Sequence, residues 1–248
     1  QIEIPVIIGG REIRTGKTTE AVCPHDHGHV LATVHQAGPR EVEKAVVAAE
    51  KAWHEWSELD WEARAAVLLK AGELLAGPWR DTLNAATMLN QSKTVFQAEI
   101  DAAAEIVDFF RYNPYYMQQL YAQQPGSAPG IWDYAEYRAL EGFVFAVTPF
   151  NFTSISANLP TAPALMGNTV LWKPASTSLY SNYFIMKLLE EAGMPPGVIN
   201  FLPGKGASVG DPVMAQPGLA GIHFTGSTGT FQRLWTQVGD NIANYRTY

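Results

Sequence analysis

The stretch FVFAVTPFNF, residues 143–152, opens the part of the chain that decides the fold. Residues 143–148 form an apolar run without the alternation of a half-buried strand, which predicts a strand buried on both faces. Comparable short strands are predicted at residues 169–173, 198–202 and 221–225.

Helical patterns separate these strands. We expect helices at residues 156–166, 177–192 and 229–238, and a short helix after Gly206. An alternation of buried strands and helices favours right-handed crossovers between parallel strands. The sequence therefore predicts an α/β protein with a Rossmann-like, doubly wound parallel sheet.

A turn-rich segment and a helical segment precede the alternating region. Strands are expected at residues 6–8, running into a hairpin turn, and at 31–34. Apolar stripes at helical spacing predict three helices, at residues 40–56, 61–76 and 98–120, with an interruption of the third near Pro114. These helices need a surface on which to pack their apolar faces, and the sheet supplies it.

The composition narrows the class of protein. The chain has 248 residues, 47% hydrophobic and 17% charged, with a net charge of −7 and a pI near 5.4. An acidic protein of this kind is not expected to bind nucleic acid or an anionic membrane, and no apolar run approaches the ~20 residues that span a bilayer. Cys23, the only cysteine, excludes an intramolecular disulfide framework. We expect a soluble protein of a reducing compartment with no secretory leader. Because the first residue is not Met, we expect a trimmed or excerpted chain.

Ligands of doubly wound sheets bind at the carboxyl ends of the strands, and each predicted strand ends in polar residues or glycine. Lys173 faces a crevice in one interpretation and is a snorkelling surface lysine in the other. Asn151 is either a turn residue or an amide donor to an oxyanion. The segment GSTG, residues 226–229, is either an ordinary turn or a pyrophosphate site at a helix start.

Taken in order and spacing, these strand ends resemble the aldehyde dehydrogenase superfamily. The matching motifs are TPFNF (148–152), WKPA (172–175), PG (203–204) and FTGS (224–227), and the resemblance covers essentially the whole chain. Finer motifs resemble the Δ1-pyrroline-5-carboxylate dehydrogenase branch of that family: FFRYN (109–113), NFTSI (151–155), ALMGN (164–168) and FQRLW (231–235).

The resemblance implies a role for individual residues. It makes Asn151 the amide that stabilises the oxyanion of a thiohemiacetal, and Phe152 an aromatic packed on the aldehyde chain. It places the backbone of Thr148 near the nicotinamide half of the cofactor, Lys173 on the adenosine ribose and Gly204 beside the adenine pocket. The loop and helix start near the pyrophosphate would comprise Gly226, Ser227, Thr228, Gly229 and Thr230.

Two further residues are candidates for the site. Many family members carry a glutamate three residues after the strand-end lysine, where it repels the 2′-phosphate of NADP. This chain has Ser176 there, so NAD is expected to be preferred with NADP usable, unless Ser176 merely caps the next helix. The acids of the predicted helix 98–120 are interpreted mostly as a solvated face, with Glu105 a candidate to reach the substrate pocket; they are Glu99, Asp101, Glu105 and Asp108.

The expected organisation follows from the same resemblance. Residues 1–123 would form the N-terminal hairpin and helices of the cofactor domain, residues 124–142 a small protruding oligomerisation arm, and residues 143–248 the Rossmann-like NAD-binding core. The catalytic domain, with the nucleophilic cysteine and the general-base glutamate of the family, is expected beyond residue 248. Cys23 lies in none of the family's catalytic motifs and is interpreted as a structural thiol.

The resemblance implies an NAD-dependent oxidation of L-glutamate γ-semialdehyde to L-glutamate in proline catabolism. The expected partners are a small aldehyde and further copies of the chain, in a bacterial cytoplasm or a mitochondrial matrix. The alternatives are a non-catalytic nucleotide-binding or assembly module and an aldehyde dehydrogenase with another substrate. No metal is expected, and His25, His27 and His29 are interpreted as a solvated loop rather than as ligands.

Overall fold

The computed structural model describes residues 2–246. The strands are β1 (Ile2–Ile4), β2 (Val6–Ile8), β3 (Arg11–Ile13), β4 (Thr18–Cys23), β5 (Asp26–His35), β6 (Phe143–Val147), β7 (Thr169–Lys173), β8 (Ile199–Phe201) and β9 (Leu219–Phe224). The helices are α1 (Pro39–Trp56), α2 (Trp61–Ala76), α3 (Arg80–Gln91), α4 (Val95–Ala98), the π-helical η1 (Glu99–Glu105), α5 (Ile106–Tyr121), α6 (Thr153–Leu165), α7 (Leu179–Ala192), α8 (Gly206–Met214), α9 (Thr228–Asn241) and the 3₁₀ turn η2 (Ile242–Asn244).

The central sheet has the strand order β3-β2-β8-β7-β6-β9. Strands β6, β7, β8 and β9 run parallel, as the alternating pattern predicted. The N-terminal hairpin β2–β3 extends this sheet on the β8 side in antiparallel orientation, through the single pair Ile7–Phe201. The sheet is therefore mixed rather than purely parallel, because the hairpin covers the edge that β8 would otherwise expose.

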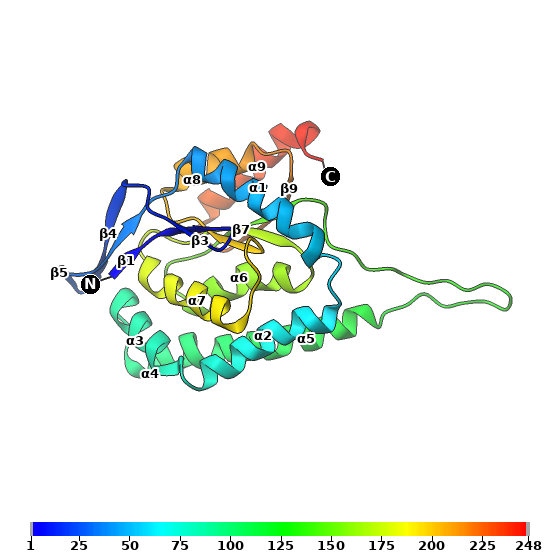
Figure 1. Ribbon diagram of the computed structural model, residues 1–248, viewed down its shortest axis with the longest axis horizontal. Coiled ribbons are helices and arrows are strands. Elements are labelled where there is room, and N and C mark those ends of the chain that lie inside the picture. Colours follow the sequence, from blue (N-terminus) through cyan, green and yellow to red (C-terminus); the bar gives the residue numbers. More distant parts are fainter. Residues whose placement is uncertain (1, 247–248) are drawn as a thin grey trace.

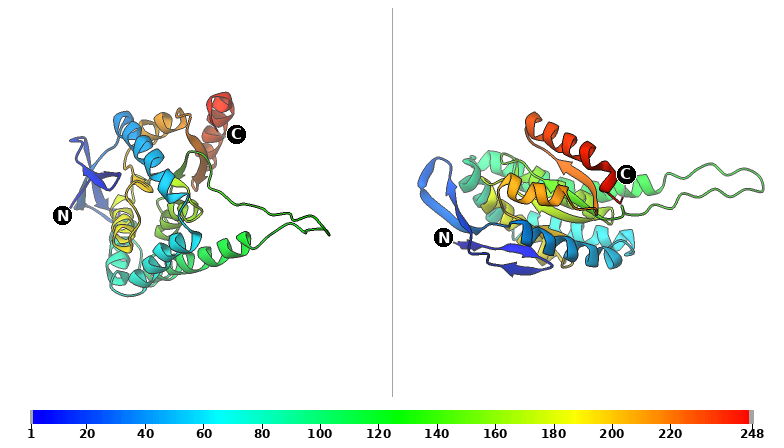
Figure 2. Two further views of the ribbon diagram at one scale, coloured as in Figure 1. Left: turned by 45° about the vertical axis from the view of Figure 1, so that its right-hand side comes forward. Right: turned by 90° about the horizontal axis from the view of Figure 1, so that it is seen from above.

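Helices cover both faces of the sheet, which explains the continuously apolar strands (Figures 1 and 2). Phe143 and Phe145 of β6 pack with α1, α8 and α9, whereas Val144 and Ala146 point to the opposite face and pack with α6 and α7. Trp172 of β7 is fully buried on that second face, with its ring edge-on to Phe201. Burying such a side chain contributes about 1.5–3 kcal/mol, so both faces hold the doubly wound arrangement together.

A further layer, formed by α2, α3 and α5, packs outside α6 and α7. The structure places α2 at the residues predicted for it, but helix α3 was not predicted. The expected interruption near Pro114 is wrong, because α5 continues through it to Tyr121. Pro114 is buried, so its packing offsets the lost hydrogen bond. The irregularity lies earlier, in the π-helical η1.

The N-terminal region also forms a small sheet of its own, in the order β1-β5-β4. The interpretation of the histidine triplet as a loop is wrong for two of its members, since His27 and His29 belong to β5. Both side chains are exposed. Among residues 2–246, no cluster of histidine, cysteine and acidic side chains is arranged to hold a metal ion.

A long connection between α5 and β6, residues 122–142, extends away from the body of the protein (Figure 1). It includes exposed aromatic residues, with Trp132 stacked on Tyr134. Its two halves are joined where Gln124 and Ala135 exchange two hydrogen bonds. The connection is thus a projecting loop that extends outward and returns to the body of the protein (Figure 1). Within the described part of the chain, every helix is too short or too polar to cross a membrane.

Candidate cofactor-binding cleft

The order of the strands reverses beside β6. The chain runs from β6 to β7 to β8 in one direction, and then returns through α8 to β9 on the other side of β6. A doubly wound sheet opens a crevice at the carboxyl ends of the strands where such a reversal occurs. Here the crevice is a cavity of about 300 Å³, lined by the ends of β6, β7 and β9 and by the beginnings of α8 and α9.

The end of β6 contributes backbone to this cleft. Thr148 lines it, but its hydroxyl points away from it and accepts a hydrogen bond of 3.1 Å from Nε1 of Trp172. The amide of Thr148 also donates to the carbonyl oxygen of Lys173. These bonds fix the turn that follows β6, so a ligand in the cleft meets a rigid backbone there.

Lys173 is a buried residue that lines the cleft. Its side chain lies at the end of β7 with 8% of its surface exposed, and Nζ donates a hydrogen bond of 2.9 Å to the carbonyl oxygen of Pro174. The interpretation as a snorkelling surface lysine is therefore wrong. Burial lowers the pKa of Lys173 to about 8, because the charged form loses hydration that no carboxylate replaces.

Ser176 also lines the cleft, together with Lys173. Helix α7 begins at Leu179, and the residue in its N-cap position is Ser178. Ser176 is thus not the helix cap, and its hydroxyl lies 3.5 Å from the carbonyl oxygen of Gly204. The position is exposed and can accommodate a larger side chain.

The start of α9 faces the same space. Gly226, Ser227 and Thr230 line the cleft, whereas Thr228 and Gly229 do not. Ser227 caps the helix, since its hydroxyl accepts a hydrogen bond from the amide of Thr230. The remaining amides of the first turn have no partner within the helix, and together with the helix dipole they favour an anion.

Gly204 supports the cleft without lining it. A Cβ atom there would lie 2.6 Å from Cγ2 of Val209 and 3.0 Å from the carbonyl oxygen of Ala37. Glycine is needed because α8 and the segment before α1 pack against this strand end. Arg233 and Asp211, which form an ion pair at the cleft between α9 and α8, were not predicted as site residues. Arg233 lies in the FQRLW motif, but that motif indicated a branch of the family rather than a site residue, and Asp211 lies in none of the motifs.

The predicted substrate residues gather at a second place, the N-terminus of α6. Asn151 and Phe152 are both exposed in the turn between β6 and α6. Glu105, in η1, is half-buried and accepts a hydrogen bond of 2.7 Å from the hydroxyl of Ser154 in the first turn of α6. The structure thus brings Glu105 to the same turn as Asn151.

Two residues at this turn, Asp101 and Lys93, were not predicted as site residues. Asp101 was interpreted as part of a solvated face, but it is 3% exposed and lies beneath the turn, where Lys93 contacts it. A signal was available, because Asp101 lies three residues after the buried Ala98 and next to Ala102, on the apolar stripe of its helix.

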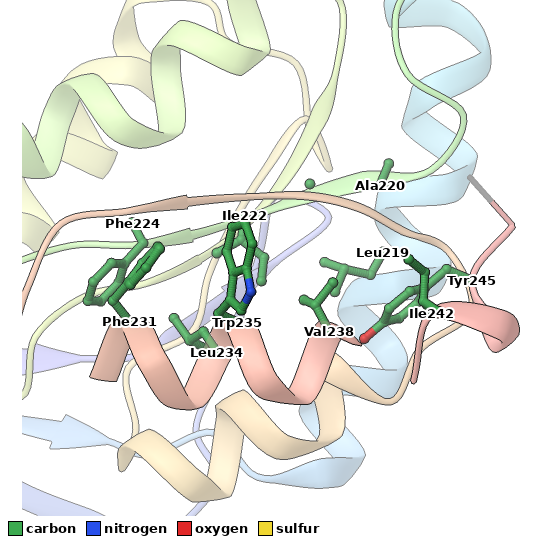
Figure 3. A pocket seen from close by; sticks show the side chains of 11 residues that line it. Leu219, Ala220, Ile222, Phe224, Phe231, Leu234, Trp235, Val238, Ile242 and Tyr245 are labelled. Atoms are coloured by element: carbon green, nitrogen blue, oxygen red, sulfur yellow. The ribbon is translucent and has the colours of Figure 1, made fainter. Parts of the chain in front are cut away.

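A second hollow, of about 320 Å³, lies between α9 and β9 (Figure 3). The side chains that line it are apolar or aromatic, and they include Phe231, Trp235 and Ile242. None of its lining residues is charged, so it does not suit a phosphate. Cys23, which was interpreted as a structural thiol, is buried in β4 beside His25 and does not line the cleft.

A doubly wound sheet with a cleft at the point of strand reversal defines a nucleotide-binding type of α/β protein. The aldehyde dehydrogenase family model matches residues 12–246, and the chain belongs to the aldehyde dehydrogenase family. The resemblance that the strand-end motifs indicated is therefore confirmed at the level of the family.

Individual relatives refine this assignment. The chain is 51% identical to the Delta-1-pyrroline-5-carboxylate dehydrogenase of Agaricus bisporus and 46% identical to the mitochondrial Delta-1-pyrroline-5-carboxylate dehydrogenase of Homo sapiens, over 99% of its own length in both cases. It matches a crystal structure of the Mycobacterium tuberculosis Delta-pyrroline-5-carboxylate dehydrogenase bound with NAD at a TM-score of 0.98 and 54% identity, over 100% of this chain and 46% of that one. The chain covers 45% and 44% of the two curated relatives, so it spans less than half of their length.

Proposed function

We propose that this chain forms the cofactor-binding part of an enzyme that oxidises L-glutamate γ-semialdehyde, which is in equilibrium with Δ1-pyrroline-5-carboxylate, to L-glutamate. One observation carries the proposal: a buried lysine and the open start of α9 face a single cleft at the point of strand reversal. The likeness to proteins named as Delta-1-pyrroline-5-carboxylate dehydrogenases, one of them solved with NAD, supports both the substrate and the cofactor.

The residues of the cleft fit a dinucleotide. Lys173 is buried against the cleft with a backbone carbonyl as its hydrogen-bond acceptor, so its remaining protons are available to ribose hydroxyls. The first amides of α9 suit a pyrophosphate.

In this proposal NAD supplies the acceptor for the hydride that leaves the substrate carbon. Lys173 holds the adenosine ribose, and the rigid backbone at Thr148 orients the nicotinamide half. The side-chain amide of Asn151 donates a hydrogen bond to the oxygen that becomes negatively charged when a nucleophile adds to the aldehyde. Such a donor lowers the barrier to addition because it is already in place when the charge develops. Phe152 and Glu105 would contact the substrate from the same turn.

We further propose that NAD is preferred but NADP is usable. Ser176 lines the cleft beside Lys173 and bears no charge, so it does not repel a 2′-phosphate. Lys173 would attract that phosphate when protonated, and its pKa of about 8 keeps most of the group charged at neutral pH.

The projection of residues 122–142 is proposed to contact a second copy of the chain. Its side chains Ile131, Trp132 and Tyr134 are 59%, 81% and 63% exposed, and such a cluster of apolar surface is typical of an interface. The proposed location is the cytoplasm of a bacterium or the mitochondrial matrix of a eukaryote. The name of the human relative describes that protein as mitochondrial, which supports the second location.

The test is an assay of NADH formation by the full-length protein with Δ1-pyrroline-5-carboxylate. We expect saturable activity, and we expect Asn151→Ala to lower kcat by about 10²–10³ while the KM for NAD stays within about twofold. Asn244→Ala, at an exposed amide on η2, is the control and should keep wild-type rates.

Each negative result has its own meaning. Activity with other aldehydes but not with Δ1-pyrroline-5-carboxylate would overturn the substrate assignment. Saturable NAD binding without turnover of any aldehyde would favour a non-catalytic module. Full activity of Asn151→Ala would remove the proposed role of that amide.

A further inference from the structure

The ammonium group of Lys93 contacts the exposed turn that carries Asn151. Nζ of Lys93 lies 2.5 Å from Oδ2 of Asp101 and 2.6 Å from the carbonyl oxygen of Asn151. The same atom lies 4.6 Å from the centre of the Phe152 ring, in the position of a cation–π contact. A single cation thus contacts both residues of the turn that were assigned to the substrate.

Asp101 anchors this cation and the start of α6 at the same time. Its two carboxylate oxygens accept hydrogen bonds of 2.9 Å from the backbone amides of Thr153 and Ser154. The N-cap position of α6 is occupied by Phe152, which has no side-chain acceptor, so Asp101 supplies the cap from another helix. A carboxylate there also complements the positive end of the helix dipole.

The setting makes this arrangement rigid. The side chain of Asp101 is 4% exposed and that of Lys93 is 15% exposed, so water does not replace either partner easily. Asp101 lies in η1, the π-helical segment, and π-helical turns occur frequently at functional sites. Lys93 lies outside the cleft and lines none of it.

We propose that Lys93 and Asp101 are positioning residues that hold the Asn151 amide in the geometry needed to stabilise an oxyanion. The inference rests on the proposed function of Asn151. Holding a reacting group in place matters because a displacement of about 1 Å costs up to about 10² in rate. The pair acts on the turn and not on the cleft, so its loss should impair turnover and spare NAD binding.

The test is a double-variant cycle in the full-length protein. We expect Lys93→Met to lower kcat at least about tenfold with the KM for NAD within about twofold, and Lys93→Arg to restore most of the loss because it keeps the cation. In an Asn151→Ala background, Lys93→Met should have little further effect, because the side-chain amide that Lys93 positions is already absent. Asp101→Asn is the second variant, with the same shape but no charge. Arg111→Met, which breaks the exposed ion pair with Glu73, is the matched control and should leave kcat unchanged.

The thermal midpoint of each variant gives a readout that does not depend on activity. Full activity of Lys93→Met and Asp101→Asn, or effects that multiply with that of Asn151→Ala, would overturn the inference. So would a parallel loss of kcat, NAD affinity and thermal midpoint without rescue by arginine, because that is the pattern of a purely structural role.

A simple aldehyde, propanal, is assayed beside Δ1-pyrroline-5-carboxylate. If only propanal is oxidised, the substrate assignment fails and the cycle still tests the positioning role. If Asn151→Ala is impaired and the Lys93 and Asp101 variants are not, the inference fails alone. No NADH from either aldehyde would overturn both.

Discussion

Lys173 shows how burial can give one residue its chemistry. No acid among residues 2–246 pairs with its ammonium group, and desolvation lowers its pKa to about 8. The folded-state pKa lies below that of an ordinary lysine, so the folded protein bears a cost for the charge at neutral pH. That cost decreases as the pH rises above about 8, where the amine becomes neutral in the fold, and it is gone only above the ordinary lysine pKa of 10.5. A ligand that supplies acceptors to this group would offset the same cost, which fits a binding role.

The neutral side chain at position 176 leads to a prediction about cofactor choice. Ser176→Glu in the full-length protein should raise the NAD/NADP ratio of kcat/KM by about tenfold or more, because a carboxylate in the cleft repels the 2′-phosphate. Initial rates with each cofactor give the ratio. Thr177→Glu is the control, since Thr177 is exposed next to Ser176 but does not line the cleft. An unchanged ratio in the Ser176 variant would contradict the argument.

At this scale, sequence reasoning succeeds where a residue has a local signature. Lys173 is identifiable because a charged residue ends an apolar strand. The role of Asp101 was not predicted because its partners lie far from it in the sequence. Lys93 is 8 residues away, and the amides of Thr153 and Ser154 are 52 and 53 residues away. The apolar stripe around Asp101 indicates burial, but it does not show that the carboxylate caps another helix. Only the packing of η1 against α6 establishes that role.

At the scale of elements, the pairing of β6 with β9 depends on a close contact at its beginning. The amide of Phe143 donates to the carbonyl oxygen of Gly218, and β6 is preceded by Gly142 with a φ of +122°. A Cβ atom at Gly142 would lie 2.1 Å from that carbonyl oxygen. Glycine is required here because both the backbone conformation and the available space exclude a side chain.

Gly142→Ala is therefore expected to destabilise the protein by about 2–3 kcal/mol, through strain and a displaced strand pair. The thermal midpoint should fall by about 4–12 °C for a chain of this size. Gly126→Ala is the control, since a Cβ atom there meets nothing within 4 Å and its φ is not positive. Equal midpoints for the two variants, measured by differential scanning calorimetry, would show that the close contact is unimportant.

The elements also show where pattern-based prediction ends. The residues predicted for β7 and α2 match the structure because their patterns have clear stops: a proline follows β7, and a Gly-Pro pair follows α2. The continuation of α5 through Pro114 was not predictable, because a local breaking signal is outweighed by burial in the outer layer. The hairpin β2–β3 was predicted, but its attachment to β8 depends on a contact between residues far apart in sequence.

For the whole molecule, the important feature is the place where strand order reverses. Two crossovers lead away from β6 in one direction and the third returns on its other side. The connections that follow β6 and β9 therefore lead to helices on opposite faces of the sheet, which leaves room for a ligand between them. The cofactor cleft and the Asn151 turn both follow from β6, one directly at its end and the other a few residues later. Binding and positioning of the reacting groups therefore depend on the same strand.

The most direct test of this account is a calorimetric titration of NAD into the full-length protein and its Lys173→Met variant. We expect saturable binding to the wild type and a Kd at least about tenfold higher in the variant, because a charge-assisted donor to the ribose is lost. The thermal midpoint of the variant should not fall, since a buried charge is removed. Lys51→Met, at an exposed position of α1, should bind NAD as the wild type does. Equal affinities of the wild type and Lys173→Met, or no saturable binding of NAD, would contradict the assignment of this cleft to the cofactor.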